Sequence, residues 1–487
     1  MKVLLFIIAT MLIHSSGLMA QDPIRVGSKL FNESVILGEI ITQSIENAGF
    51  DVEYSDQLGG TRILWNALLT DELDIYPDYT GTIVFELLGE TEPLTIAEIN
   101  RKIEVFGIQI TNTLGFNNTY ALGMRMDHAE DLGIEAISDL REHPELNFGF
   151  SNEFLNRADG WPGIQSTYNL DGSNVTGLDH DLAYRGLENE NIDVIDLYST
   201  DAEIDYYELK VLEDDFGFFP DYAAVIVYRS DLNKDVQKLL GNLEFTINEA
   251  DMISMNADVK LKGIDDEIVA YRFLNGIFGI EITHQSDNRS DRLKETTIDH
   301  LILVGVSLAL AILLAIPLGI AAFQFKKIEQ LILSMVGILQ TIPSLALLVF
   351  MIPLFGIGTI PAMAALFIYS LLPIVRNTHS GLVSMNNGLK ESAVALGLPK
   401  SVILKKIELP LALPSILAGI KTSAVINVGT ATLGALIGAG GYGQPILTGI
   451  RLDDTALILE GAIPAAVLAL LAQWFFDLIE KRFSYPT

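Results

Sequence analysis

The sequence contains no cysteine. Disulfide bonds, thiolate metal sites and a lipid-modified N-terminal cysteine are therefore excluded. Histidine is scarce as well, with seven residues in 487. They are scattered along the chain and do not have the spacing of a metal-binding cluster. If part of this chain is soluble and works at a membrane, the polypeptide itself must hold it there.

Two catalytic motifs are also missing. No Gly-x4-Gly-Lys-Ser/Thr loop occurs, and the glycine-rich run GALIGAGGYGQP at 434–445 is not followed by the lysine that a phosphate-binding loop requires. No Gly-x-Ser-x-Gly nucleophile elbow occurs either. We therefore predict that the chain is not an enzyme and that it binds no cofactor of its own.

Basic residues are few relative to acidic ones. The chain has 31 Lys+Arg against 62 Asp+Glu, a net charge of −31. Residues 298–487 carry a net charge of +2 and residues 1–20 carry +1, which leaves −34 for residues 21–297. A nucleic-acid surface needs clustered basic residues, so we predict no nucleic-acid partner. The split predicts an acidic soluble module joined to a nearly neutral membrane module.

Long apolar runs occur at the two ends of the chain. Residues 1–20 place Lys2 before an apolar run and end in small residues, which is the layout of a secretory signal peptide. Five longer apolar segments follow the acidic region, at 298–323, 328–355, 360–374, 413–437 and 455–476. The predicted domains are a signal peptide at 1–20, an extracytoplasmic domain at 22–285, a linker at 286–297 and a transmembrane domain at 298–487.

The positions of basic residues predict the orientation of these spans. With the acidic domain outside, five spans place the C-terminus in the cytoplasm. The basic residues then on the inner side are Lys326, Lys327, Arg376, Lys390, Lys400, Lys405, Lys406, Lys481 and Arg482. Arg451 is the one basic residue of the outer loops, and Asp453 and Asp454 offset it. We predict a multi-pass protein of the plasma (inner) membrane with a periplasmic N-terminal domain.

Strand-like and helix-like segments alternate between residues 24 and 280. Strands are predicted at 24–28, 51–56, 74–79, 148–152, 192–198 and 223–229, and helices at 34–48, 61–70, 81–88 and 181–190. This alternation predicts parallel sheets with helices on both faces. We expect the chain to cross between two lobes near 120–125 and again near 222–229, which gives a clamshell that closes on a small ligand.

A polar stretch at 380–410 separates two apolar segments. It reads SGLVSMNNGLKESAVALGLPKSVILKKIELP, with Glu391, Ala393 and Gly397 followed at fixed offsets by Ile407 and Pro410. This spacing resembles the EAA loop of ABC importer permeases. The resemblance implies a cytoplasmic helix, a turn at the glycine and a second helix that dock into a separate ABC ATPase subunit, which holds ATP and Mg²⁺. The alternative is an amphipathic helical hairpin at the membrane surface.

Motifs spread over residues 24–280 carry a second resemblance. They read VGSKLFNESVILGEI, LGGTRILWNAL, DIYPDYTGT, FNNTYALGMR, SNEFLNRADGWPG, DVIDLYSTDAEI and FFPDYAAVIVYR. They are similar to the substrate-binding proteins of osmoprotectant ABC importers. The sequence departs from that family at Leu30, Ser34 and Trp161, where Asn, Gln and Tyr are common, and these departures leave the substrate open.

The two resemblances together imply a fold and a function. The fold is an α/β two-lobed periplasmic-binding-protein clamshell (type II) fused to an all-α polytopic ABC-importer transmembrane domain. The function is ATP-driven import of a quaternary ammonium compound such as glycine betaine, choline or carnitine, through a pore formed with a second copy of the chain. The alternatives are import of another methylated zwitterion, such as ergothioneine, and a ligand-sensing membrane receptor.

Four tyrosines are the candidate ligand-binding residues. A trimethylammonium group makes no strong hydrogen bond, so a protein holds it by dispersion and by the negative faces of aromatic rings. Four tyrosines lie at the ends of predicted strands or at the predicted crossovers. The resemblance implies that they form an aromatic cage around the ligand: Tyr79, Tyr120, Tyr198 and Tyr222. The alternative for each single tyrosine is a packing role with a solvated hydroxyl.

A carboxylate on the ligand requires hydrogen-bond donors near the same strand ends. The candidate donors are Thr80, Thr82, Ser34 and Asn118. Their alternative role is turn and capping chemistry, because Thr, Ser and Asn beside turns often bond their own backbone. Lys29 and Arg157 are alternative anion partners, and Asp74 and Asp78 add negative potential around a cation.

Overall fold

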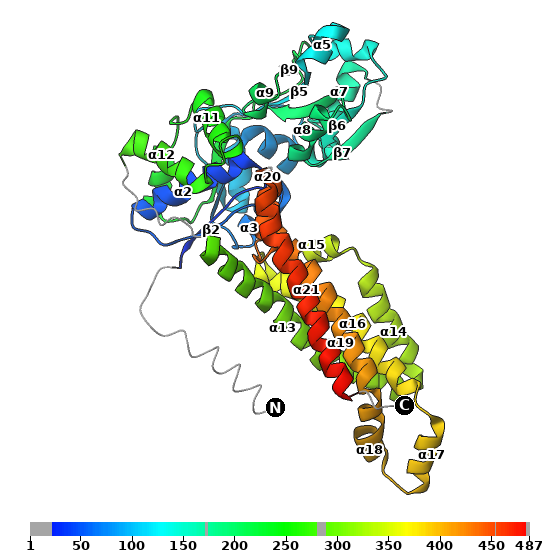
Figure 1. Ribbon diagram of the computed structural model, residues 1–487. Coiled ribbons are helices and arrows are strands. Elements are labelled where there is room, and N and C mark those ends of the chain that lie inside the picture. Colours follow the sequence, from blue (N-terminus) through cyan, green and yellow to red (C-terminus); the bar gives the residue numbers. More distant parts are fainter. Residues whose placement is uncertain (1–21, 171–173, 280–288, 453, 484–487) are drawn as a thin grey trace.

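The computed structural model describes residues 22–170, 174–279, 289–452 and 454–483. An α/β domain of two lobes stands at one end of a helical bundle, and a helical hairpin stands at the other end (Figure 1). The predicted signal peptide at 1–20 lies outside the described residues. The two parts therefore have the fold class that the sequence predicts.

The first lobe contains a five-stranded sheet of order β2-β1-β3-β10-β4. Its strands are β1 (Ile24–Gly27), β2 (Val52–Ser55), β3 (Ile75–Tyr79), β4 (Ile108–Ile110) and β10 (Ala224–Arg229). The first three strands are parallel, and β10 runs antiparallel to both β3 and β4. The predicted return of the chain to the first lobe near 222–229 is confirmed, because β10 joins this sheet.

The second lobe repeats this arrangement with the order β7-β6-β8-β5-β9. Its strands are β5 (Tyr120–Arg125), β6 (Phe148–Ser151), β7 (Val175–Leu178), β8 (Val194–Tyr198) and β9 (Leu209–Val211). Strands β6, β7 and β8 are parallel, whereas β5 is antiparallel to β8 and β9. The first crossover thus ends where β5 begins, as the sequence predicts.

Helices cover both sheets. In the first lobe these are α2 (Asn32–Asn47), α3 (Thr61–Leu69), a π-helical turn at Thr82–Leu87 and α4 (Ile96–Ile103). The second lobe has α5 (Met126–Leu132), α6 (Asn152–Asn156), α7 (Trp161–Tyr168), α8 (His180–Glu188) and α9 (Glu203–Tyr206). The domain ends with α10 (Lys234–Asn242), α11 (Glu249–Lys260) and α12 (Asp266–Phe278), and both α11 and α12 pack on α2. One apolar core runs from α2 through both lobes.

The helical domain is built mainly from apolar helices. They are α13 (Arg289–Gln324), α14 (Lys326–Thr341), α15 (Ser344–Phe355), α16 (Thr359–Val383), α19 (Leu409–Thr430) and α21 (Thr455–Phe483). Four helices in the described residues are long and apolar enough to cross a membrane, and the pair α14 and α15, bent by 99°, makes five if it is one span. The bend follows Thr341 and precedes Ser344, at Pro343, which has no backbone N–H to continue the ladder.

The segment 286–297, expected as a linker, is helical from Arg289 onward. It forms the first turns of α13, and Arg292 pairs with Glu460 of α21 at 3.0 Å. Backbone hydrogen bonds within a helix are independent of side-chain polarity, so a polar run beside an apolar span extends it readily.

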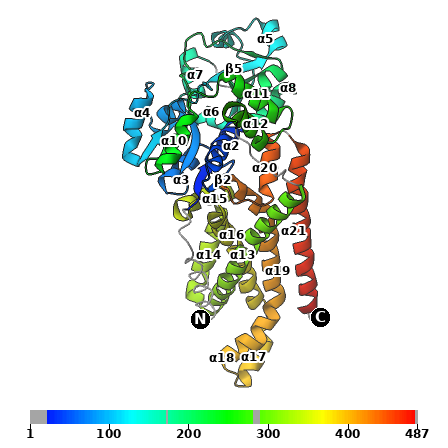
Figure 2. The same ribbon diagram turned by 90° about the vertical axis from the view of Figure 1, so that its left-hand side faces the viewer.

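The hairpin at the far end of the bundle has the helix–turn–helix form expected for 380–410. Its helices are α17 (Asn387–Ala395) and α18 (Lys400–Ile403), and a π-helical turn at Leu404–Glu408 leads into α19. Gly397 lies between the helices with φ of 72°, the left-handed conformation that glycine adopts without strain. Lys390 pairs with Glu408 across the hairpin at 3.3 Å. Both views place this hairpin opposite the α/β domain (Figures 1 and 2).

Candidate functional site

The four predicted tyrosines gather between the two lobes. Tyr79 ends β3 and Tyr198 ends β8, whereas Tyr120 begins β5 and Tyr222 lies just before β10. Because β10 and β5 run antiparallel to β3 and β8, Ala224 pairs with Tyr79 and Tyr120 pairs with Tyr198. The carboxyl ends of parallel strands in each lobe thus face the gap, which is where α/β folds bind ligands.

The tyrosine cage (Tyr79, Tyr120, Tyr198 and Tyr222) is tightly packed. The ring centroids of Tyr120 lie 5.1 Å from Tyr198 and 5.5 Å from Tyr222, the latter edge to face. Phe31, in the turn before α2, links the remaining ring, because it lies 6.1 Å from Tyr79 and 5.6 Å from Tyr198. Phe31 is absent from the sequence predictions, although it stands in the motif VGSKLFNESVILGEI with Leu30 and Ser34, two of the three departures from the family pattern.

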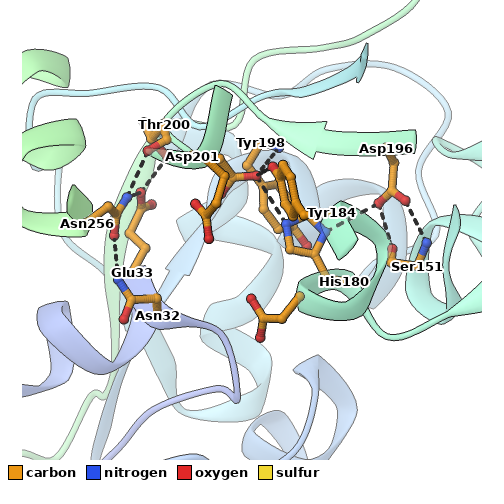
Figure 3. Close-up of polar contacts among 12 residues, drawn as sticks. Asn32, Glu33, Ser151, His180, Tyr184, Asp196, Tyr198, Thr200, Asp201 and Asn256 are labelled. Atoms are coloured by element: carbon orange, nitrogen blue, oxygen red, sulfur yellow. Dashed lines mark hydrogen bonds and ion pairs between the residues drawn. The ribbon is translucent and has the colours of Figure 1, made fainter. Parts of the chain in front are cut away.

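Glu33, also absent from the sequence predictions, lies at the centre of the site. Its side chain is buried and accepts hydrogen bonds from the hydroxyl of Tyr79, from Asn118 Nδ2 at 2.9 Å, from Thr200 Oγ1 and from Asn256 Nδ2 at 3.2 Å. Burial raises the pKa of Glu33 to about 7, because the loss of hydration outweighs these hydrogen bonds. Figure 3 shows Glu33 facing Thr200 and Asn256.

A partly buried histidine supports the tyrosine cage from the second lobe. His180 Nε2 lies 3.1 Å from Asp201 Oδ2, its Nδ1 lies 3.8 Å from Asp196 Oδ2, and its ring lies 4.6 Å from that of Tyr198 (Figure 3). Burial lowers the pKa of His180, but the two carboxylates outweigh it and raise the pKa well above the usual range. The imidazolium therefore fixes the end of β8 and the loop after it, which carry Tyr198 and Thr200 respectively.

Three of the four candidate hydrogen-bond donors for a ligand carboxylate, Ser34, Thr80 and Asn118, bond other protein groups. Ser34 Oγ accepts from the backbone N–H of Lys29 at 2.9 Å, and Thr80 Oγ1 accepts from the N–H of Ala223 at 3.0 Å. Asn118 donates to Glu33, while its Oδ1 is buried without a hydrogen-bond partner among the described residues. Thr82 is buried at the start of the π-helical turn after β3.

The candidate anion partners Lys29 and Arg157 lie over rings of the cage. Lys29 Nζ is 2.6 Å from Asp78 Oδ1 and 5.8 Å from the ring centroid of Tyr79. The Arg157 guanidinium pairs with Asp159 and with Glu86, and it lies 5.7 Å from the ring centroid of Tyr120. Cations therefore contact these aromatic faces in the protein itself. Asp74, at the edge of the first lobe, instead pairs with Arg25 at 2.8 Å.

Two cavities border the tyrosine cage. The larger has a volume of about 360 Å³ and is lined from both lobes by Arg62, Phe85, Glu86, Glu153, Asn156, Arg157, Ala158 and Asp159. The smaller, next to Phe31, Glu33 and Tyr198, has a volume of about 10 Å³, the space of roughly one water-sized probe. A trimethylammonium group therefore reaches the aromatic faces beside Glu33 only if the lobes separate or the rings rotate.

Comparison with protein families divides the chain in the same way. Residues 22–276 match the model of the substrate binding domain of the ABC-type glycine betaine transport system. Residues 308–485 match the binding-protein-dependent transport system inner membrane component.

Individual relatives match one or both parts. The choline transport system permease protein of Bacillus subtilis (strain 168) is 41% identical over 186 residues, which are 38% of this chain and 86% of that protein. The ergothioneine transport permease/ergothioneine binding protein of Helicobacter pylori (strain G27) is 33% identical over 262 residues, which are 52% of this chain and 47% of that protein. A crystal structure of a glycine betaine/carnitine/choline ABC transporter is 28% identical, covers 52% of this chain and 98% of its own, and gives a TM-score of 0.45.

Proposed function

Because the chain belongs to the family of substrate-binding domains of ABC-type glycine betaine transport systems and carries a binding-protein-dependent permease component, we propose that it imports a quaternary ammonium compound with energy from a separate ATPase. The α/β domain captures the solute outside the membrane. The helical domain conducts it inward as the permease subunit. The substrate is glycine betaine, choline, carnitine or a similar compound.

The observation that carries this proposal is the tyrosine cage with Phe31 and Glu33. Five aromatic rings meet between the lobes, and Glu33 is buried against Tyr79. A cation without N–H groups gains from aromatic faces and from a nearby carboxylate, and it needs no hydrogen-bond acceptor. A neutral sugar or a peptide requires many directional hydrogen bonds, whereas the faces of this cage are aromatic and the donors around Glu33 already bond that carboxyl group.

The second candidate substrate is ergothioneine, another methylated zwitterion. The relative from Helicobacter pylori carries both functions in its name, permease and ergothioneine binding protein, and this chain likewise contains both parts. The betaine group of such a ligand suits the same tyrosine cage. Its larger ring requires more space, and the cavity of about 360 Å³ beside Arg157 offers it.

The hairpin of α17 and α18 is proposed as the contact with the ATPase. Val394 and Leu396 are 60% and 79% exposed there, so apolar side chains are available for a protein groove. Glu391 is exposed beside them, Ala393 packs inward, and Gly397 makes the turn. This assignment places the hairpin and the C-terminus in the cytoplasm and the binding domain outside. We further propose that a second copy of the chain completes the pore.

Calorimetric titration of the full chain in lipid nanodiscs tests the substrate. We expect binding of choline, glycine betaine, carnitine or ergothioneine, and a Tyr198→Ala variant to bind between about twofold and thirtyfold more weakly, because one ring contributes roughly 0.5 to 2 kcal/mol. Tyr206→Ala is the matched control, because Tyr206 is 62% exposed outside the cage. A folded chain that binds none of the four compounds would disprove the substrate class.

A further inference from the structure

One arginine of the membrane domain is buried in the binding domain. Arg451 is the last residue of α20 (Gly443–Arg451), and 3% of it is exposed. Its Nη1 donates to Asn32 Oδ1 at 2.7 Å and to Asp266 Oδ1 at 3.0 Å, and its Nη2 donates to Asp266 Oδ2 at 2.7 Å. Asn32 and Asp266 are the first residues of α2 and α12, so one guanidinium joins two helix N-termini of the binding domain.

Other contacts show that α20 as a whole is a docking element. Gln444 Nε2 donates to Asp56 Oδ1 at 2.7 Å, and Gln57 Nε2 donates to Thr448 Oγ1 at 2.9 Å. Leu452, just after α20, packs against the apolar core of the binding domain. Both views show α20 reaching into the α/β domain from the top of the bundle (Figures 1 and 2).

The charge distribution explains the choice of an arginine. The binding domain carries a net charge of −34, and Arg451 is the only basic residue between Lys421 and Lys481 in the sequence. A guanidinium presents a planar pair of N–H groups that matches one carboxylate in two-point geometry. Removing one partner of such a buried pair leaves the other charge uncompensated, so the contact is expected to depend strongly on Arg451.

Buried polar groups continue from Arg451 to the ligand site. Asn32 Nδ2 donates to Asn256 Oδ1 at 3.1 Å, and Asn256 Nδ2 donates to Glu33 Oε2 at 3.2 Å and to the carbonyl oxygen of Thr200 at 2.9 Å (Figure 3). Two side chains, Asn32 and Asn256, thus connect Arg451 of the membrane domain to the carboxyl group that contacts Tyr79. Asn32, Glu33 and Asn256 are each less than 7% exposed, so water does not replace these contacts.

We propose that Arg451 docks the membrane domain onto its own binding domain and senses the ligand site through Asn32 and Asn256. A ligand that changes the position of Glu33 changes the hydrogen bonds of Asn256 and then those of Asn32. This alters the hydrogen bond that Asn32 accepts from Arg451. Because such coupling is reciprocal, docking must change ligand affinity by the same factor as the ligand changes docking. The sensing step rests on the proposed function, whereas the docking step does not.

Cysteine crosslinking measures the docking step. The chain has no cysteine, so Asp56→Cys and Gln444→Cys create a single pair, which a short bifunctional thiol reagent joins in the reconstituted full chain. Mass spectrometry quantifies the crosslinked peptide. In this background we expect Arg451→Glu to reduce the crosslink at least tenfold and the charge swap Arg451→Glu with Asp266→Arg to restore at least half of it.

Two controls make this result specific. Arg125→Glu removes an arginine that pairs with Asp127 and Glu190 in the second lobe, and it should leave the crosslink unchanged. A mixture of the two single-cysteine chains should give no crosslink, because docking is within one chain. An unchanged crosslink in the Arg451→Glu variant, or a crosslink between chains, would overturn the docking step.

Ligand titration of the same samples measures the sensing step. The quaternary ammonium compound that binds the full chain should change the crosslink yield, and the Arg451→Glu variant should show a ligand affinity shifted by the same factor. Asn32→Ala keeps the ion pair between Arg451 and Asp266. The crosslink between positions 56 and 444 should therefore persist in this variant, but its yield should no longer respond to the ligand. A yield that is insensitive to a bound ligand would overturn sensing. A chain that binds no such compound refutes the proposed function and the sensing step, and leaves the docking result standing.

Discussion

The substitution Glu33→Gln should remove a pH dependence of ligand binding. Burial raises the pKa of Glu33 to about 7, so its carboxyl group is mainly neutral at pH 6 and mainly ionised at pH 8. If the cation binds the ionised site, affinity rises about tenfold between pH 6 and pH 8, which corresponds to about 1.4 kcal/mol. Glutamine has nearly the same shape and no charge in this range.

The pKa values of the neighbouring His180 and Tyr79 are both shifted upward. Burial is outweighed by the carboxylates of Asp201 and Asp196, which raise the pKa of His180 well above its usual range, and burial raises the pKa of Tyr79 well above 10, so the Tyr79 hydroxyl stays neutral between pH 6 and pH 8. The pKa of Asp201 is lowered, chiefly because His180 outweighs its burial. Choline has no titratable group in this range, which makes it the best probe.

Calorimetry of the full chain with choline at pH 6, 7 and 8 is the assay. We expect a steep rise in affinity for the unmodified chain and a flat profile for Glu33→Gln. Stability should change in the opposite direction. The folded state binds the Glu33 proton more tightly than the unfolded state, so its stability falls by up to about 3 kcal/mol as pH rises from about 4.5 to 7. Equal pH profiles for both chains would refute this role of Glu33.

Three further predictions follow from the site and the hairpin. Phe31→Ala should weaken quaternary ammonium binding between about twofold and thirtyfold in calorimetry, because an aromatic face of roughly 0.5 to 2 kcal/mol is lost, whereas Phe106→Ala, at a half-exposed ring, should not. His180→Ala should destabilise the protein by up to about 3 kcal/mol in thermal unfolding, because Asp196 and Asp201 lose a partly buried cation; an unchanged melting temperature would contradict the ion-pair interpretation. Gly397→Val should abolish cellular uptake and leave ligand affinity intact, because a φ of 72° strains a β-branched residue by roughly 1 to 2 kcal/mol and displaces the hairpin; normal uptake would contradict the coupling role.

The sequence predicts the arrangement of the lobes well because local patterns determine it. Strand-like segments alternate with helix-like ones along the sequence, and the two crossovers follow from where that alternation resumes after long connections. The four tyrosines come together for the same reason, since Tyr79 and Tyr198 end strands whose carboxyl ends face the gap. To predict that these tyrosines meet, it is enough to know where each strand ends and in which direction it runs.

Glu33 and Arg451 could not be predicted in this way. A glutamate in the first turn of α2 is typical of a solvated residue that complements the helix dipole. It is buried because Asn118, Thr200 and Asn256 approach it from segments 85, 167 and 223 residues away. The sequence predicts that Arg451 is the lone basic residue of the outer loops, offset by Asp453 and Asp454, whereas its partner Asp266 lies 185 residues earlier in the chain. Partners this distant carry no periodic signal.

The near-complete filling of the space beside Glu33 has a kinetic consequence. Because the cavity next to Phe31 and Tyr198 is about 10 Å³, the ligand enters only from a state in which the lobes are apart or the rings have rotated. The observed rate of capture should then rise with solute concentration and level off at the rate of that opening motion. The strong negative charge of the domain speeds the first encounter with a cation, but it leaves this plateau unchanged. At low solute concentration the rate of capture is limited by encounters with the solute, and at high concentration it is limited by the protein's own opening motion.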